Sequence, residues 1–129
     1  MPSRAIRAID FATVRELAAT LPGVETGTTY GSPALKVGGR MFACMAIHRS
    51  AERHTLAVRV DVAQRDELLA ADPDTYYLTD HYVGYPVVLV RLARVHRDAL
   101  RDLLRMGWQF TSERARRRST RRRAPSRSR

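Results

Sequence analysis

Cysteine is almost missing from this chain of 129 residues, since Cys44 is the only one. A single cysteine excludes an internal disulfide and fits a reducing compartment. Long apolar runs are missing too, because the longest stretch, Pro86–Val90, is far shorter than the roughly 20 residues that a membrane-spanning helix needs. The first residues also lack the charged-then-apolar pattern of a signal peptide. We therefore expect a cytoplasmic protein without membrane contact.

Acidic residues are missing from residues 114–129, and this absence divides the chain into two parts. These last positions hold nine arginines and no Asp or Glu, so the overall net charge of +10 falls to +1 for residues 1–113. The first part has the size of one domain, whereas the Arg/Ser/Thr/Pro composition of the second cannot form a core. We therefore predict a folded domain at 1–113 and a disordered arginine-rich tail at 114–129.

Apolar residues recur at helix or strand spacing along the first part and predict an α+β fold. Helices are expected over residues 9–20, 63–71 and 96–110, and strands over residues 34–37, 40–48, 55–60, 75–79 and 86–92. Short turns between strands favour antiparallel pairing, and the helices must then cover one face of the sheet. The prediction is a two-layer sandwich with an antiparallel five-stranded sheet, the order α-β-β-β-α-β-β-α, and the helices on one face.

Motifs that would indicate catalysis or a cofactor are missing as well. No Gly-rich loop precedes a helix, and no set of ligands stands at a metal spacing. His81 follows Asp80, but adjacent residues in a strand or turn point apart, and no nucleophile accompanies them. We expect no cofactor, no metal and no catalytic residue. A small-molecule site or enzyme around His81, Tyr82 and Tyr85 is the third-ranked interpretation.

Positive charge within residues 1–113 could also meet a polyanion. If strand alternation turns Leu35 and Val37 toward the helices, Lys36 lies on the opposite sheet face, and Arg59 does so by the same argument. The turns before Arg40 and over residues 48–54 are candidate hairpin tips that could contact phosphates. The candidate nucleic-acid contacts are Lys36, Arg40, Arg49, Arg53, Arg59, Arg91, Arg116, Arg117, Arg118, Arg121, Arg122 and Arg123. The alternative is that those within the domain are ordinary surface cations whose stems cover the sheet.

Several segments, in this order, resemble the MmcQ/YjbR family of small bacterial proteins. They are Leu21–Val24, Tyr30–Phe42, Tyr76–Pro86, Val88–Leu92 and Trp108. The resemblance spans roughly residues 8–110. It implies a CyaY-like, secretion-chaperone-like α+β fold and DNA binding through a double-wing arrangement of β-hairpins. The chain departs from the family in its arginine-rich tail, and in Pro86-Val87, where many members have a tryptophan.

Charge and resemblance together favour a nucleic-acid-binding accessory protein, with DNA favoured over RNA as the partner. Most contacts would be non-specific and would come from the tail and the basic hairpins. The alternative is a protein-binding module that uses the open face of the sheet. Salt separates the two, because phosphate binding falls steeply with ionic strength and apolar docking does not.

Overall fold

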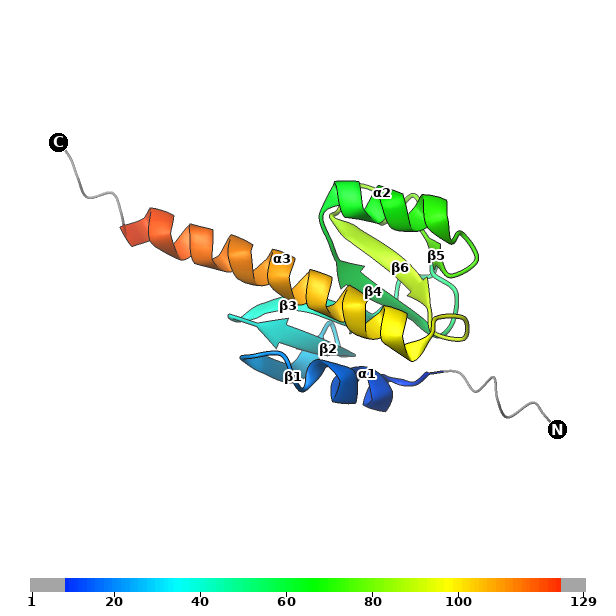
Figure 1. Ribbon diagram of the computed structural model, residues 1–129, viewed down its shortest axis with the longest axis horizontal. Coiled ribbons are helices and arrows are strands. Elements are labelled where there is room, and N and C mark those ends of the chain that lie inside the picture. The colour runs from blue at the N-terminus through cyan, green and yellow to red at the C-terminus, as the bar shows by residue number, and fades with distance from the viewer. Residues whose placement is uncertain (1–8, 124–129) are drawn as a thin grey trace.

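The computed structural model describes residues 9–123, with side chains through Arg117. Its elements follow one another as α1 (Phe11–Ala18), β1 (Val24–Thr29), β2 (Ser32–Val37), β3 (Arg40–Met45), β4 (Thr55–Arg59), α2 (Val62–Ala71), β5 (Tyr76–Tyr77), β6 (Val87–Arg91) and α3 (Arg97–Arg123). All neighbouring strands are antiparallel, in the spatial order β1-β2-β3-β4-β6-β5. Three helices with a six-stranded open sheet confirm the predicted α+β class (Figure 1).

The predicted count of five strands is wrong because β1, which precedes the first predicted strand at residues 34–37, was not predicted. Its four central residues are exposed, and it pairs only with β2, as an edge strand. An edge strand whose central residues are exposed needs no apolar alternation, so its sequence carries no strand period. Tyr30 and Gly31 close this hairpin with φ values of 52° and 80°, as a type I′ turn requires.

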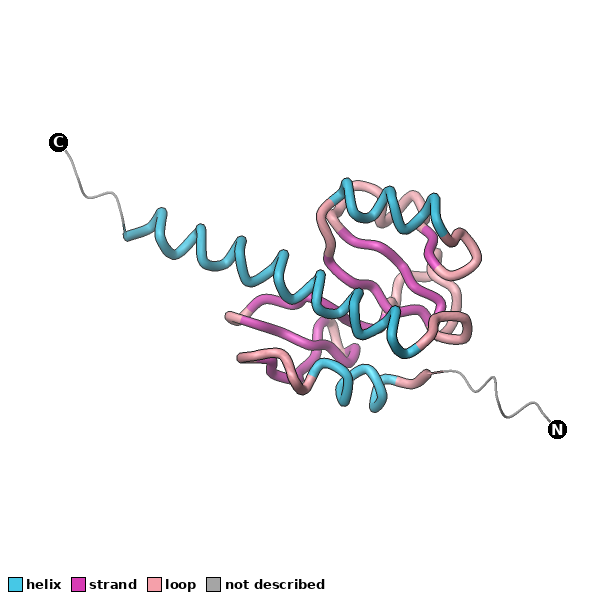
Figure 2. Tube along the Cα trace, in the orientation of Figure 1, coloured by secondary structure: helices cyan, strands magenta, loops and turns pink. Residues whose placement is uncertain are grey.

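The core lies between the sheet and the helices. α1 and α3 run side by side across the sheet, as Figure 2 shows, and α2 adds Leu68 and Leu69 at the margin of the same core. Both N-caps follow from the sequence: Asp10 accepts a hydrogen bond from the Thr13 N–H at 3.0 Å, and Asp61 accepts one from Ala63 at 3.1 Å. The fully buried side chains include Val14, Leu35, Phe42, Leu56, Val58, Val88, Leu100, Leu103 and Leu104.

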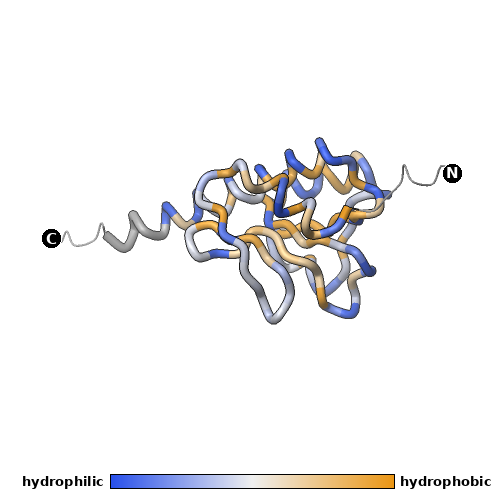
Figure 3. Tube along the Cα trace, turned by 90° about the horizontal axis from the view of Figure 1, so that it is seen from below, coloured by the Kyte–Doolittle hydropathy of each residue, from blue (hydrophilic) through white to orange (hydrophobic). Residues whose placement is uncertain are grey.

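A β-bulge in β3 shapes the sheet beneath α3. Lys36 pairs with Met41 and Leu35 pairs with Ala43, so Phe42 is the extra residue between them. Phe42 and Ala43 are consequently both fully buried, although they are adjacent. Cys44 then lies on the opposite, open face of the sheet, because it pairs with Ala57 rather than with a core-facing residue. Figure 3 views the molecule from below, at 90° to Figure 1, with helices along the top and loops extending at the bottom.

Candidate functional site: a basic helix and a pocket on the open sheet face

α3 is longer than the sequence predicted. The expected helix ended at Phe110 with a disordered tail from residue 114, whereas α3 continues through Arg123 and extends beyond the sheet (Figure 1). Arginine and alanine are good helix formers, so a helix already held by the core can continue through them. The turn between β2 and β3 also contacts this extension, because a Cβ on Gly38 would lie 3.6 Å from the Ala115 Cβ. Residues 124–129 of the predicted tail lie outside the described residues.

The tail arginines that were predicted to contact nucleic acid therefore lie on α3, at least as far as Arg123. Arg114 lies over the Phe110 ring, with the guanidinium carbon 5.2 Å from the ring centroid. Arg116 and Arg117 are exposed. Arg118, Arg121, Arg122 and Arg123 have helical backbone, and the placement of their side chains lies outside the described part of the chain.

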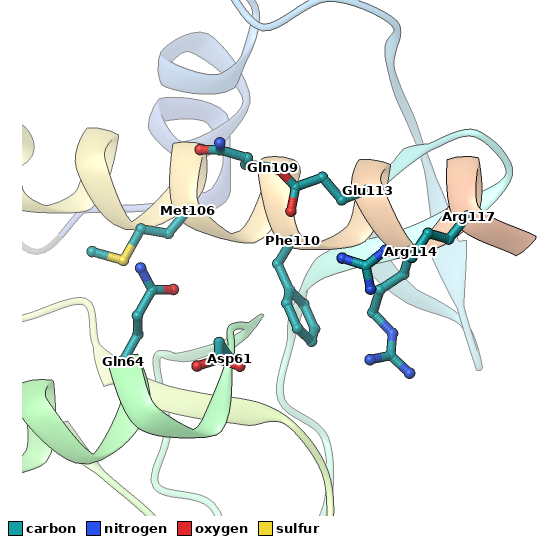
Figure 4. Close-up of a pocket in the computed structure, with 8 residues that line it drawn as sticks. All are labelled: Asp61, Gln64, Met106, Gln109, Phe110, Glu113, Arg114 and Arg117. Carbon is teal, nitrogen blue, oxygen red and sulfur yellow. The ribbon is translucent and has the colours of Figure 1, made fainter.

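A polar pocket of about 440 Å³ separates α3 from the start of α2. Figure 4 shows Gln64 of α2 opposite Met106 of α3, and Asp61, the N-cap of α2, beside Phe110, with Arg114 and Arg117 at one end. Glu113 also lines the pocket, so carboxylates and guanidiniums share it. Because the two signs of charge offset each other there, this pocket selects no class of charged ligand.

Three arginines gather where α3 crosses the end of β4, and we call them the arginine cluster: Arg40, Arg59 and Arg114. Arg59 is half-buried, and its Nε has no hydrogen-bond partner among the described residues. Burial lowers the Arg59 pKa, and the positive charges of Arg114 and Arg40 lower it further. The cluster is therefore a concentration of positive charge that a bound anion would relieve.

Arg91 differs from its predicted role, because its guanidinium is already engaged. Its Nε and Nη2 each donate to a carboxylate oxygen of Glu52 at 2.8 Å, and its Nη1 donates to the Pro73 and Asp74 carbonyls at 3.2 and 2.9 Å. The guanidinium carbon also lies 4.3 Å from the centroid of the Tyr77 ring. Arg91 therefore links three segments of the domain.

The other predicted basic positions do not converge on the arginine cluster. Lys36 lies directly across from Glu25 on β1, and its stem lies over Gly27. Arg49 and Arg53 are exposed on the loop between β3 and β4, which was predicted to be a hairpin tip. Side-chain contacts hold this loop against the domain. Besides the Glu52 contact, Ser50 Oγ lies 2.8 Å from an oxygen of Thr79. Of the three sheet positions in the predicted basic patch, Arg59 belongs to the arginine cluster, Lys36 lies across from Glu25, and Arg91 is bound to Glu52.

His48 anchors this loop through a hydrogen-bond chain of defined direction. The Ser50 N–H donates to His48 Nδ1 at 3.0 Å, so Nδ1 carries no proton. Ser50 Oγ must then donate to the same nitrogen at 2.8 Å and accept from the Thr79 hydroxyl. The His48 ring also stacks on His81, with centroids 3.6 Å apart and an angle of 8° between the planes. His81 therefore supports the loop, and no nucleophile or carboxylate is in hydrogen-bond contact with it among the described residues.

Acid should weaken this anchoring. Burial lowers the His48 pKa, and the neighbouring His81 and Arg49 lower it further, so the folded protein favours the neutral ring. The stabilisation is fully present above the unfolded pKa of about 6.5 and falls as pH drops below it toward the folded pKa, because only the unfolded state then binds a proton readily. Proton NMR titration of the His48 ring should give a pKa below 6.5, and a value at or above 6.5 would contradict this geometry.

The open face carries a second pocket, of about 600 Å³, which we call the open-face pocket. Its floor is formed by Met41, Cys44, Ala57 and Val87, with Arg59 at the margin. A row of small side chains runs across three strands here, since Ala34 pairs with Cys44 and Cys44 pairs with Ala57. The pocket exists because these small side chains leave space above the strands. The sequence analysis missed it, since the row appears only once the strand register is known.

Aromatic residues form the walls of the open-face pocket. The predicted ligand residues His81, Tyr82 and Tyr85 come together on one side, with the His81 and Tyr82 centroids 4.8 Å apart. Tyr30 stands at the rim with 91% of its surface exposed. It also has a left-handed backbone, which is unfavourable for a bulky residue and is seen mostly where function or a turn imposes it. Burial raises the pKa of Tyr82 and of Cys44 on the floor, so both stay neutral.

Neither a membrane helix nor a metal centre is found within residues 9–123. No helix there combines sufficient length with apolar character, and no three potential ligands come together to hold a metal ion.

The fold and its open face define a class of small α+β proteins with an antiparallel sheet backed by helices. The YjbR family model matches residues 19–110, and the chain belongs to this family, which confirms the resemblance seen in the sequence. The uncharacterized proteins Rv2570 of Mycobacterium tuberculosis and Mb2600 of Mycobacterium bovis are each 41% identical over 54 residues. This match covers 41% of the chain and 42% of each relative, so it spans about two fifths of their length.

A solved structure supports the fold. The Deinococcus radiodurans protein DR2400, with a DUF419 domain, aligns with a TM-score of 0.64 at 24% identity. The alignment covers 78% of this chain and 76% of that chain. At this identity the similarity establishes the fold alone.

Proposed function

We propose that this protein binds nucleic acid, with duplex DNA as the favoured partner, through the arginine-rich end of α3. The observation that carries the proposal is that Arg114, Arg116 and Arg117 leave the domain on one continuous helix and form no ion pair within the described part of the chain. After Glu113 the sequence contains no further acid. A helix whose arginines form no ion pairs attracts phosphates and releases their counterions.

The arginine cluster extends this charge onto the domain. Arg114 belongs both to the helix and to the cluster, where it lies near Arg40 and the half-buried Arg59. A phosphate backbone lying along α3 would thus meet positive charge at the base of the helix as well as along it. Phosphate contacts of this kind position a duplex without reading its sequence, so binding should be non-specific.

Salt dependence of the full chain on a short duplex tests the proposal. Replacing Arg114, Arg116 and Arg117 together with glutamine keeps helix-forming residues and removes three charges. If these arginines contact phosphates, the slope of log affinity against log salt should become shallower by about 2–3. Fluorescence anisotropy over a salt series measures this slope.

The matched control is the triple glutamine variant of Arg97, Arg101 and Arg105, which are exposed on the first half of the same helix. It removes the same charge, and its slope should change by less than about 1. Equal effects of the two triple variants would show that overall charge, not this part of α3, governs binding. If the parent chain has no measurable affinity for DNA or RNA even at low salt, the proposal fails, and protein docking on the open sheet face replaces it.

A further inference from the structure

The open-face pocket holds an unpaired positive charge within apolar surroundings. Arg59 lines the pocket, and no Asp or Glu is among the residues that line it. The Arg59 Nε is buried without a hydrogen-bond partner in the described part of the chain. The Nε itself is enclosed by protein, so an anionic oxygen in the pocket would contact the terminal nitrogens of the guanidinium and offset its charge. His48 adds no second charge at neutral pH, because its Nδ1 accepts two hydrogen bonds.

The shape of the pocket suits a flat ring system. Its floor over Cys44 and Ala57 is low and apolar, and aromatic side chains flank it on two sides. Tyr85 is 56% exposed, so the edge of its ring is available for contact, as is that of Tyr30. A volume of about 600 Å³ lies within the range of small-molecule sites, which are mostly apolar with a few polar groups that fix orientation.

We propose that the open-face pocket binds a small organic anion: an apolar, preferably aromatic, ring system that carries one carboxylate, sulfonate or phosphate group. The anionic group lies on Arg59, and the ring lies over Cys44 and Ala57 between the tyrosines. The site shares Arg59 with the arginine cluster but includes none of Arg114, Arg116 and Arg117, so its occupancy does not require nucleic-acid binding.

A pair of fluorescent probes tests both halves of the ligand. Anilinonaphthalene sulfonate and phenylnaphthylamine share one ring system, but only the first carries an anionic group. The full chain should bind the sulfonate at least about tenfold more tightly than the neutral probe, the factor expected for one hydrogen bond to a charged group. Replacement of Arg59 with glutamine should remove this preference while leaving the weaker binding of the neutral probe. Replacement of the exposed Arg53 with glutamine is the control and should change neither.

The rate of Cys44 alkylation gives a second measurement of probe binding. As the only cysteine, on the floor of the pocket, it reports occupancy directly. Saturating sulfonate should slow alkylation of Cys44 several-fold, and the glutamine variant of Arg114, Arg116 and Arg117 should show the same protection. In that variant DNA binding falls and probe binding remains, so the two proposals can fail separately.

The outcomes are distinct. If Arg59→Gln binds the sulfonate as tightly as the parent chain, or if the sulfonate leaves Cys44 alkylation unchanged, the proposed site is wrong. If the Arg114, Arg116 and Arg117 variant loses the sulfonate while Arg59→Gln keeps it, the probe binds α3 and the proposal is overturned. A circular-dichroism melt of each variant confirms that a loss of binding is not a loss of fold.

Discussion

Gly107→Ala is expected to destabilise the protein, although alanine is normally the better helix residue. A Cβ at position 107 would lie 2.8 Å from the backbone oxygen of Arg59 and 2.8 Å from Val58 Cγ1. Exchange of glycine for alanine in a helix is ordinarily favourable by roughly 1 kcal/mol. Here a backbone carbonyl cannot rotate away, so α3 must move off β4, and overpacking of this kind costs about 1–3 kcal/mol. Chemical denaturation gives the free energy of unfolding.

The control is Gly84→Ala. A Cβ there would meet nothing within 4 Å, and Gly84 does not have the left-handed backbone of Gly31 or Gly39. Its free energy of unfolding should stay within about 0.5 kcal/mol of the parent value. A Gly107→Ala protein as stable as the parent would show that α3 lies less tightly on β4 than the structure indicates. Because Arg114 on α3 is near enough to Arg59 on β4 to lower its pKa, the geometry of this contact also influences the arginine cluster.

Local patterns were enough to place most of the helices and strands. Asp10 and Asp61 mark the starts of α1 and α2, and Gly38-Gly39 forms the predicted two-residue turn, with φ values of 60° and 78°. Helix caps and tight turns can be predicted from the sequence because each depends on only a few neighbouring residues. β1 lacked such a signal, because an edge strand is specified by its pairing with β2 rather than by its own apolar period.

The end of α3 was missed for a different reason. Its composition resembles that of disordered segments, and composition alone predicts no packing. The helix persists because its first half is held by Leu100, Leu103 and Leu104 in the core, so the nucleation cost is already met when the chain reaches Arg114. The packed first half of α3 thus determines the conformation of the arginine-rich residues that follow it, more than their composition does.

The candidate sites depend on contacts between distant parts of the chain. The row of small residues beneath the open-face pocket needs the registers of β3 against β2 and against β4, and the bulge at Phe42 shifts the first of these by one residue. The charge on Arg91 looked available in the sequence because its partner Glu52 lies 39 positions away. Side-chain partners at this separation follow from the folded topology and not from local pattern.

Arg91→Ala is expected to have the largest effect of any surface substitution in the domain. The side chain is only 26% exposed, and it joins three segments: Glu52 on the loop after β3, the Pro73 and Asp74 carbonyls before β5, and the Tyr77 ring. Hydrogen bonds from a charged donor contribute about 1.5–3 kcal/mol, and the solvent-exposed Glu52 carboxylate reduces the sum. We expect a loss of about 2–3 kcal/mol in the free energy of unfolding. Arg91→Lys should recover only part of it, because an ammonium has three donors and cannot reproduce the four hydrogen bonds that the guanidinium makes.

Arg94→Ala is the matched control for Arg91→Ala, since Arg94 is exposed and only three positions further along the chain. It should cost less than about 0.5 kcal/mol. Hydrogen exchange adds a local measurement: in Arg91→Ala the amides of Ser50 and Glu52 should exchange faster, because the loop that carries them loses its carboxylate anchor. The Glu52 N–H donates to the Tyr77 hydroxyl at 2.8 Å, so it reports that docking directly. Equal stability and equal exchange in the two variants would mean that Arg91 is an ordinary surface cation, and the phosphate-contacting role first predicted for it would be open again.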